Sequence, residues 1–315
     1  MERSWEELID IDMKKYLHIE YAQSELPNYI FPVDKVEGCY IYSRGKKILD
    51  CMSQLYCVNI GQVNPKIQKA IKDALSDFGF VWEAFLTKNR ALATEQLMSL
   101  VEPDGWAGRC KFVNTGSEAN EENFIIAKLY RNAPHIMTRE SAYHGWTEGP
   151  GQATRVRRVR GALTHPTKNI IRDVPGFNMP GYYVAPAPYC FKCPLGQTYP
   201  DCKGKGPYGH KGILACVDQT ESLIRTIGQE TFAAMITEII MGAGTIVPPQ
   251  EYIPQLTKML KSLGVLWIDD EVICGFARTG KWFAYQHYPG VKPDLMTMGK
   301  GIVSSQLPAA GIIVS

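Results

Sequence analysis

Two short apolar segments, each followed at once by reactive side chains, constrain this sequence most. Residues 265–268 form an apolar, partly β-branched run of the kind found in buried parallel strands, and three consecutive carboxylates follow at 269–271. Residues 295–298 form a second such run, which is followed by glycine, Lys300 and glycine. Because open α/β sheets bind ligands outside the carboxyl ends of their strands, we expect an acid and an amine in one binding site.

Catalysis by pyridoxal phosphate is one chemistry that needs this pair. A lysine amine condenses with the aldehyde of the cofactor, while a carboxylate beside the pyridine nitrogen keeps that nitrogen protonated, so that the ring can accept electrons. Lys300 and Asp270 suit these two catalytic roles. An isolated lysine and aspartate are more simply read as surface residues that never meet, so the assignment depends on the surrounding pattern.

That pattern is DEVICGFARTG at 270–280, followed by PD at 293–294 and TMGKG at 297–301. It resembles the signature of the class III (omega) aminotransferases, which depend on pyridoxal 5'-phosphate and have fold type I. The resemblance implies an α/β fold with a mostly parallel sheet flanked by helices. A small N-terminal helix and hairpin segment, residues 1–60, would precede the cofactor-binding large domain, residues 61–315. It also implies that Val272 contacts the cofactor.

The sequence TGSEAN at 115–120 lies between a predicted strand, 110–114, and a predicted long helix. The first amide groups of a helix have no intrahelical acceptors and the helix dipole is positive there, so such a junction binds anions. Ser117 could instead simply cap its own helix. The match of NTGSEAN to the phosphate motif NSGSEA of the family assigns Gly116 and Ser117 to the cofactor phosphate.

The resemblance implies five further site residues. Tyr143, the tyrosine of a YHG sequence, would stack on the pyridine ring. His144 would lie beside the cofactor and transfer a proton, or more simply support its loop. Glu238 follows a predicted buried strand and would lie near the cofactor or restrain an arginine. Tyr56 and Trp146 are expected in the substrate pocket, with ordinary core packing as the alternative for Tyr56.

An irregular, cysteine-containing segment at about 186–216 reads as a loop insertion. Its soft side chains could bind zinc, although its second half lacks a paired CxxC or HxxxH. Free thiols are therefore the simpler expectation, and no metal is needed for the proposed chemistry. The side chains in question are Cys190, Cys193, Cys202, His210 and Cys216.

Composition excludes several classes of partner. A net charge of +2 and a charged content of 21% do not favour nucleic acid or an anionic membrane surface, and the arginines at 155–160 fit a solvated loop. The sequence has no apolar run of membrane-spanning length, and its first residues are too acidic and polar for a signal peptide. Nine cysteines, an odd number, favour reduced thiols and a cytoplasmic location.

Residue 273 narrows the expected substrates. Many class III enzymes have glutamine at this position. DEVICGF, with isoleucine at 273, instead resembles the sequence of the pyruvate-using omega-aminotransferases that act on beta-alanine, taurine or related amines. We expect transfer of an amino group from an omega-amino acid or amine, of the taurine, beta-alanine, GABA or diamine type. The acceptor would be a 2-oxo acid such as pyruvate or 2-oxoglutarate. A decarboxylase, racemase or aminomutase using the same acid and amine is the alternative.

Two further expectations follow from the resemblance alone. Members of the family are homodimers, so a homodimer is expected here. They also continue beyond the position of Ser315 into a C-terminal domain that carries an arginine for the substrate carboxylate. A truncated, non-catalytic remnant that binds the cofactor is therefore the second alternative to a transaminase.

Overall fold

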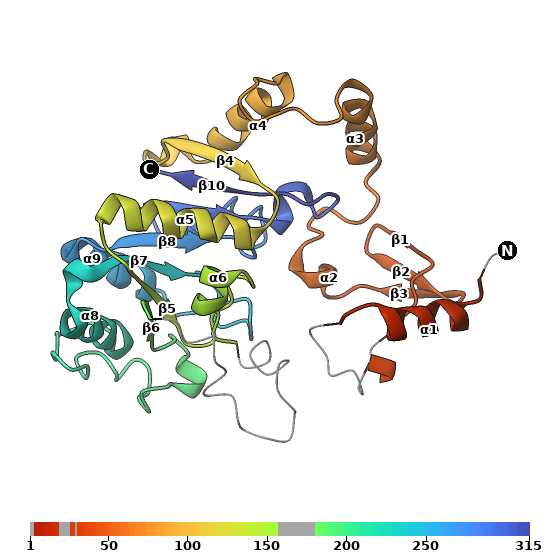
Figure 1. Cartoon of the computed structure of the whole chain (residues 1–315). Helices are drawn as coiled ribbons and strands as arrows, with labels where there is room; N and C mark the ends of the chain where they lie inside the picture. Colours follow the sequence, from red (N-terminus) through yellow and green to blue (C-terminus); the bar gives the residue numbers. More distant parts are fainter. Residues whose placement is uncertain (1–2, 19–25, 29, 157–179) are drawn as a thin grey trace.

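A seven-stranded sheet forms the centre of the molecule (Figure 1). The computed structural model describes residues 3–18, 26–28, 30–156 and 180–315. The strand order is β4-β10-β9-β8-β7-β5-β6. In that order the strands are Arg109–Val113, Ala310–Val314, Leu295–Met298, Leu266–Asp270, Phe232–Thr237, His135–Arg139 and Tyr182–Ala185.

The five strands from β9 to β6 pair in parallel, and β10 is antiparallel to both of its neighbours. This arrangement confirms the predicted mostly parallel sheet. It also brings the carboxyl ends of the parallel strands to one edge. Asp270 is the last residue of β8, and Lys300 follows β9 by two residues. Both therefore lie at this edge.

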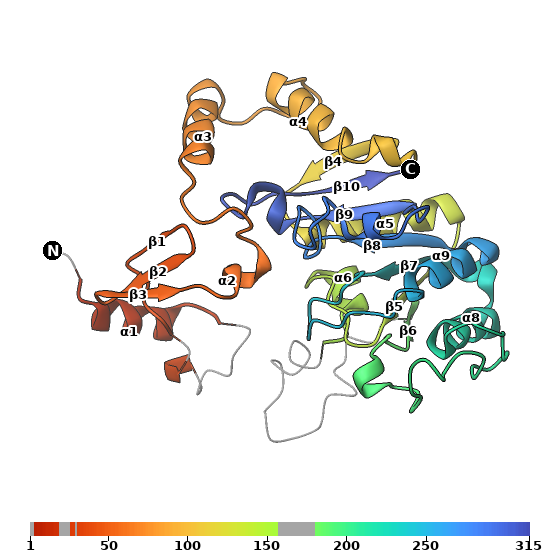
Figure 2. The same cartoon turned by 180° about the vertical axis from the view of Figure 1, so that it is seen from behind.

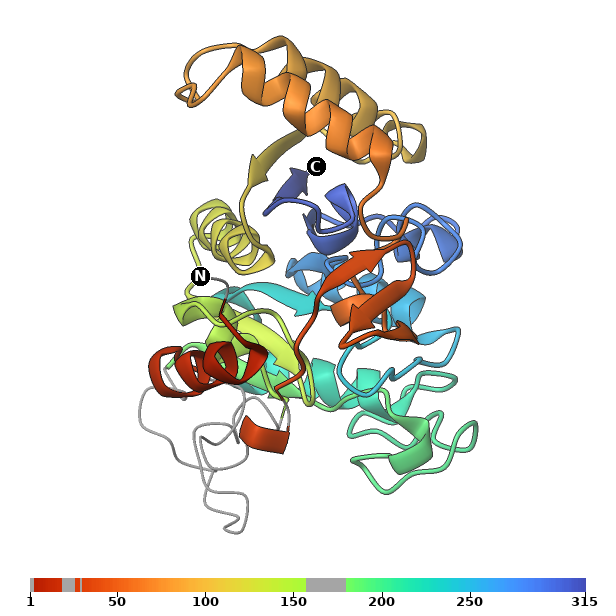
Figure 3. The ribbon, with the colours of Figure 1, turned by 90° about the vertical axis from the view of Figure 1, so that its right-hand side faces the viewer.

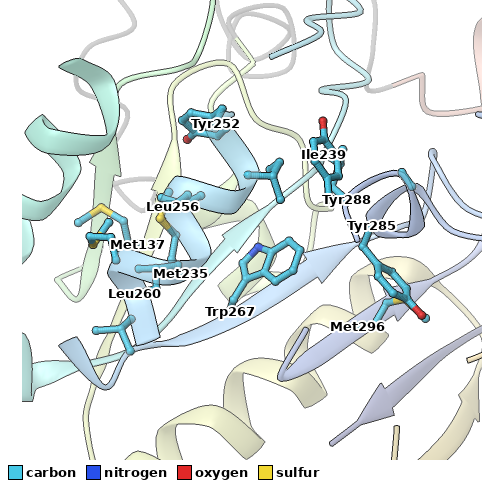
Figure 4. Close-up of a cluster of buried hydrophobic side chains, with 14 of the residues drawn as sticks. Met137, Met235, Ile239, Tyr252, Leu256, Leu260, Trp267, Tyr285, Tyr288 and Met296 are labelled. Atoms are coloured by element: carbon cyan, nitrogen blue, oxygen red, sulfur yellow. The ribbon is translucent and has the colours of Figure 1, made fainter. Parts of the chain in front are cut away.

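Helices cover both faces of the sheet because its strands are apolar on both sides (Figures 1 and 2). On one face α5, Gly116–Arg131, packs Phe124 and Ala127 against Ile268. On the other face α9, Tyr252–Leu263, packs against a cluster that contains Trp267 (Figure 4). Neighbouring residues of β8, Trp267 and Ile268, thus point to opposite faces, as the period of a strand requires.

The remaining helices flank the sheet or precede it. Among the described residues, no helix has the length and apolar composition that crossing a membrane requires. The other α-helices are α1 (Trp5–Lys15), α2 (Ser53–Tyr56), α3 (Pro65–Asp77), α4 (Lys88–Met98), α6 (Glu148–Ala153) and α8 (Ala215–Ile227). Short 3-10 helices span Leu26–Asn28, Glu102–Asp104, Cys190–Lys192, Gln229–Thr231, Ala284–His287 and Lys300–Val303.

The N-terminal elements match the predicted helix and hairpin. The capping box forms, because the Ser4 side chain accepts from the Glu7 amide while the Glu7 side chain accepts from the Ser4 amide. Strands β2, Tyr40–Ser43, and β3, Lys46–Leu49, form a hairpin whose turn residues Arg44 and Gly45 both have positive φ. A third strand, β1, Lys35–Glu37, adds to this small sheet. The boundary at residue 60 remains a prediction.

Apolar residues at helical spacing in 64–78 and 89–101 predict two helices that pack on a sheet, and this prediction is wrong for α3. This helix has no buried residue, whereas α4 buries Leu97 and Met98 at its C-terminal end. Figure 3 shows both helices beyond the edge strand β4. The helical spacing of apolar residues identified α3 correctly, but periodicity alone does not say what the apolar face contacts. The arginines 157, 158 and 160 lie outside the described residues.

Two carboxyl groups are completely buried beside Asp270. Asp269 and Glu271 are 0% exposed, and three of their four oxygens have no hydrogen-bond partner among the described residues. The fourth, Glu271 Oε1, accepts from the Tyr285 amide at 3.1 Å. Burial raises the pKa of Asp269 far above its usual range, with the charge of Glu271 adding to the effect, and burial raises the pKa of Glu271 to about 7. We infer that the pair holds a proton at neutral pH.

This proton makes stability depend on pH. The Glu271 carboxyl has a pKa of 4.5 unfolded and about 7 folded, so its contribution to stability is complete at low pH and is lost as pH rises through about 7. We expect the free energy of unfolding to fall by on the order of 1–3 kcal/mol as pH rises from 4.5 to about 7. Glu271→Gln should flatten that slope, and the exposed control Glu37→Gln should not. Denaturant unfolding at several pH values measures the free energy of unfolding as a function of pH. The same pH dependence in the unaltered chain and in both variants would refute the shared proton.

Candidate active site

The carboxyl edge of the sheet encloses a cavity of about 480 Å³. The structure places in its wall every residue that the sequence assigned to the cofactor. These residues are Gly116, Ser117, Tyr143, His144, Glu238, Asp270, Val272 and Lys300. They come from the N-terminus of α5 and from the segments that follow β5, β7, β8 and β9.

The Asp270 carboxylate is buried and hydrogen-bonded on both oxygens. Its Oδ2 lies 2.7 Å from His144 Nδ1 and accepts from Asn120 Nδ2 at 3.0 Å, and its Oδ1 accepts from the Val272 amide at 3.1 Å. Only 2% of the residue is exposed. Contacts on both oxygens therefore fix the position and orientation of the Asp270 carboxyl group in the cavity wall.

A buried amide network holds Asn120 in place. Its Nδ2 also donates to the His144 carbonyl at 2.8 Å, and its Oδ1 accepts from Thr297 Oγ1 at 2.6 Å. Asn123, one turn later on α5, donates to the same hydroxyl at 2.7 Å. All three side chains are fully buried. The network therefore ties α5 to β9 and fixes the direction in which Asn120 presents its amide to Asp270.

The N-terminus of α5 forms another wall of the cavity. Thr115 caps the helix by accepting from the Glu118 amide at 3.1 Å, which leaves the first amides of the helix without intrahelical acceptors. A side chain at Gly116 would place its Cβ 2.9 Å from Val272, so only glycine fits against the motif that follows β8. The packing that holds this helix end in the site is thus specific.

The loop of Tyr143 and His144 packs directly on this helix end. Gly145 has φ +129°, and a Cβ at this position would lie 2.2 Å from Ser117 Oγ. Ser117 Oγ also accepts from the Trp146 amide at 3.2 Å. The His144 amide donates to Thr154 Oγ1 at 2.9 Å, and His144 Nε2 is buried without a partner among the described residues. His144 thus supports the loop and orients Asp270 at once.

Lys300 lies at the end of β9 in a strained conformation, with φ +43°. Burial lowers the pKa of its amine, and the nearby charges of Asp270 and Glu238 partly oppose this effect. A lysine whose pKa is lowered carries more of the neutral amine at neutral pH, which is the nucleophilic form. The structure thus combines an activated amine and a fixed carboxylate in one cavity.

Glu238 restrains the loops around the cavity. Its carboxylate accepts from the Tyr143 amide at 3.0 Å and from the Gly242 amide at 2.7 Å, and its main-chain carbonyl accepts from the buried Arg139. Burial raises the pKa of Glu238. The sequence left open whether Glu238 lies near the cofactor or restrains an arginine; in the structure it lines the cavity and bonds Arg139 through its backbone.

Tyr56 and Trp146 are not among the described residues that line the cavity. Leu55, Ile273 and Leu307 supply apolar surface there. Tyr56 ends a short segment, α2, in which the backbone is partly left-handed, and its neighbour Leu55 is among the residues that line the cavity. A place for Tyr56 and Trp146 in the substrate pocket remains a prediction.

The structure brings the thiols of the cysteine segment near one another. All nine cysteines are free. Burial raises the pKa of the Cys216 thiol to about 12, and the nearby thiols of Cys202, Cys190 and Cys193 add to this effect. Among the described residues, however, the group whose ligand atoms all lie within 4.8 Å of one another consists of His210, Asp218 and Glu221. Zinc on Cys190, Cys193 and Cys202 remains an alternative.

Asn120, which bonds Asp270, and Thr297, which bonds Asn120, are not among the predicted site residues. Both lie inside the motifs that carry the resemblance, at the end of TGSEAN and at the start of TMGKG. Asn120 is buried in the first turns of a helix whose apolar face meets the sheet. A polar residue on such a face needs a partner, and this was the available signal.

Comparison with known proteins agrees with this geometry. Residues 21–315 match the family described as aminotransferase class-III. Putrescine–pyruvate aminotransferase of Pseudomonas aeruginosa is 33% identical over 291 residues, which cover 90% of this chain and 59% of that protein. Gamma aminobutyrate transaminase 2 of Solanum lycopersicum is 32% identical over 296 residues, with the same two coverages. The chain thus spans 59% of the length of these relatives.

Solved structures show the same fold. An S-selective transaminase from Arthrobacter sp. with alanine bound superposes with a TM-score of 0.88 at 41% identity, covering 100% of this chain and 65% of that one. A taurine:2-oxoglutarate aminotransferase from Bifidobacterium kashiwanohense, in complex with PLP and glutamate, gives 0.85 at 27% identity, covering 100% and 66%. Class III aminotransferases use pyridoxal 5'-phosphate. From the family match over residues 21–315, this chain belongs to the class III aminotransferases.

Proposed function

We propose that this chain forms the cofactor-binding part of a transaminase that moves an amino group from an amine or omega-amino acid to a 2-oxo acid. The single observation that supports this most strongly is the placement of the buried Asp270 carboxylate and the Lys300 amine in one cavity, beside the N-terminus of α5. Each of these three elements matches one part of pyridoxal phosphate.

The residues present fit that cofactor. The open amides at the start of α5 suit a phosphate, since Thr115 satisfies the Glu118 amide and not the first ones. Glycines at 116 and 145 let the helix end, the DEV segment and the aromatic loop approach closely around that anion site. The buried ring nitrogen of His144 has no partner in the cavity wall, which is what a site built around a polar ligand shows.

When bound, pyridoxal phosphate supplies an aldehyde that condenses with amines and a ring that accepts electrons. Gly116 and Ser117 would hold its phosphate, and Tyr143 would lie against its ring. Asp270 would hold a proton on the ring nitrogen, and the hydrogen bonds from Asn120 and Val272 keep this carboxylate in its ionised form.

Lys300 would serve as both amine and proton carrier. Burial lowers the pKa of its amine, which favours the neutral form that can accept a proton. Asp270 and Glu238 act on the amine in the opposite direction, which limits how far the pKa falls. The same group can therefore act as base in one half of a transfer and as acid in the other.

We propose an omega-amino acid or amine of the taurine, beta-alanine, GABA or diamine type as donor and pyruvate or 2-oxoglutarate as acceptor. The names of the relatives support this range, since they include putrescine and gamma aminobutyrate. The apolar surface of Leu55, Ile273 and Leu307 suits the methylene chain of such donors. A cytoplasmic location is also proposed, on the cysteine usage of the sequence.

Replacing Lys300 tests the activity. We expect Lys300→Ala to lower the transamination rate at least 10³-fold, because the site loses its nucleophile and its proton carrier. The exposed control Lys281→Ala should retain full activity. The assay follows the keto product and the aminated acceptor with putrescine, taurine, beta-alanine or gamma aminobutyrate as donor. Full activity in Lys300→Ala, or no amino transfer from any donor by the unaltered chain, would exclude the proposed function.

Asn120 should control cofactor affinity through Asp270. A hydrogen bond to a charged group contributes about 1.5–3 kcal/mol, so Asn120→Ala should weaken binding of pyridoxal phosphate by roughly 10-fold or more. Asn123→Ala is the matched control, because Asn123 lies on the same helix and bonds the same Thr297 hydroxyl but not Asp270. Titration by cofactor absorbance measures both. Equal losses in the two variants would mean that the network acts only on stability.

We propose that a second copy of this chain covers the exposed apolar face of α5. Leu129 is 77% exposed and Tyr130 78%, and Ile125 lies one turn before Leu129 with 55% exposed. A soluble protein rarely leaves such a row open to water. The homodimer that the family resemblance implies would bury it.

A charge on this face should separate the copies. We expect the unaltered chain to sediment as a dimer and Leu129→Glu to shift it toward the monomer by at least 10-fold in dissociation constant. Leu17→Glu is the control, because Leu17 is also 77% exposed but lies outside α5. A dimer of unchanged stability in Leu129→Glu would exclude α5 from the interface.

A further inference from the structure

The loop that precedes α8 brings a histidine onto two carboxylates of that helix. His210 belongs to the cysteine-containing segment, which passes beside α8 (Figure 1), and Asp218 and Glu221 lie three residues apart in the helix. His210 Nδ1 lies 2.9 Å from Asp218 Oδ1 and 3.6 Å from Glu221 Oε2. Among the described residues, this is the group of potential ligand atoms that all lie within 4.8 Å of one another.

Asp218 is buried within this group. Its side chain is 1% exposed, and its Oδ1, which has no partner of hydrogen-bond geometry among the described residues, lies at ion-pair distance, 2.9 Å, from His210 Nδ1. Its other oxygen accepts from the amides of Tyr208 and Gly209 at 2.8 and 3.1 Å. The two amides fix the carboxylate so that Oδ1 faces His210 and Glu221, and a neutral His210 would leave this buried charge without a compensating cation.

Glu221 is oriented in the same way. Arg225 Nε donates to Glu221 Oε1 at 2.8 Å, and this bond leaves Oε2 facing His210. One arginine balances one of the two carboxylates, so the second negative charge of the group stays uncompensated while His210 is neutral. The side chain of His210 is 48% exposed, which gives an ion a path from solvent.

We propose that His210, Asp218 and Glu221 bind a divalent transition-metal ion of the zinc type. Zinc binds imidazole nitrogen and carboxylate oxygen at about 2.0–2.2 Å, so the ligand atoms of one tetrahedral ion lie roughly 3.3–3.6 Å apart. The observed separation of 3.6 Å lies within that range, whereas 2.9 Å is that of a direct ion pair, which an ion would have to widen by a few tenths of an ångström. Three protein ligands leave a fourth position for water.

His210, Asp218 and Glu221 are not among the residues that line the proposed cofactor cavity, so the metal ion would stabilise the fold and take no part in amino transfer. The ion would link the loop at 204–213 to the first two turns of α8, which packs against the edge strand β6 and against α9. The loop already bonds within itself, as from the Gly204 amide to the Ile213 carbonyl, and a metal link would add an anchor to the helix. His210 is the ligand that the loop supplies.

Zinc titration of the purified chain tests this site. We expect saturable binding of one Zn²⁺, with affinity reduced at least 10-fold in His210→Ala and in Glu221→Gln, and a rise in melting temperature with Zn²⁺ that His210→Ala abolishes. His210 is half exposed, so its alanine variant should fold. His18→Ala is the matched control, because His18 also lies 2.8 Å from an aspartate, Asp12, without forming a three-ligand group among the described residues.

Cobalt substitution and thiol alkylation test whether the neighbouring cysteines, instead of His210, Asp218 and Glu221, bind the metal ion. Co²⁺ bound to nitrogen and oxygen lacks the intense thiolate charge-transfer band, and alkylation of Cys190, Cys193 and Cys202 should leave binding unchanged. Any of three results would overturn the proposal. These are no saturable binding, as for a simple His210–Asp218 ion pair; binding unchanged in His210→Ala; and binding lost on alkylation with a thiolate band present.

Discussion

The buried charge of Asp270 is the constraint on which the rest of the site depends. A carboxylate that is 2% exposed is stable only if donors replace the water it has lost, and here the donors come from three separate segments. Asn120 comes from α5, His144 from the loop after β5, and Val272 from the backbone beyond β8. Holding one charge therefore fixes the relative positions of three parts of the cavity wall.

The fold makes these positions available. Parallel pairing from β9 to β6 brings the ends of the strands to one edge, and apolar residues on both faces of each strand hold helices above and below. Asp269 and Glu271, which flank Asp270 in sequence, are buried more completely, and burial raises the pKa of both instead of leaving them hydrogen-bonded on both oxygens. Three consecutive acids thus have two different roles, set by which neighbours reach them.

Much of this was predictable from sequence, because the informative residues lie next to one another along the chain. The strands before Asp270 and Lys300, the helix that begins in TGSEAN and the capping box at Ser4 all have local signals. Asn120 and Thr297 were not assigned, since their partnership spans 177 positions and leaves no local pattern. The exposed position of α3 also depends on distant packing. In the loop before α8, the sequence pattern indicates the cysteines as possible metal ligands, whereas only the structure shows that His210, Asp218 and Glu221 lie together.

The central claim is that Lys300 is the amine that reacts with the cofactor in a cavity organised by Asp270. The most direct measurement is to add pyridoxal phosphate to the purified chain, reduce with borohydride and map the labelled peptide. The account predicts a new absorbance band and a single stable label on Lys300, absent in Lys300→Ala. No band, or a label spread over exposed lysines such as Lys281, would contradict it.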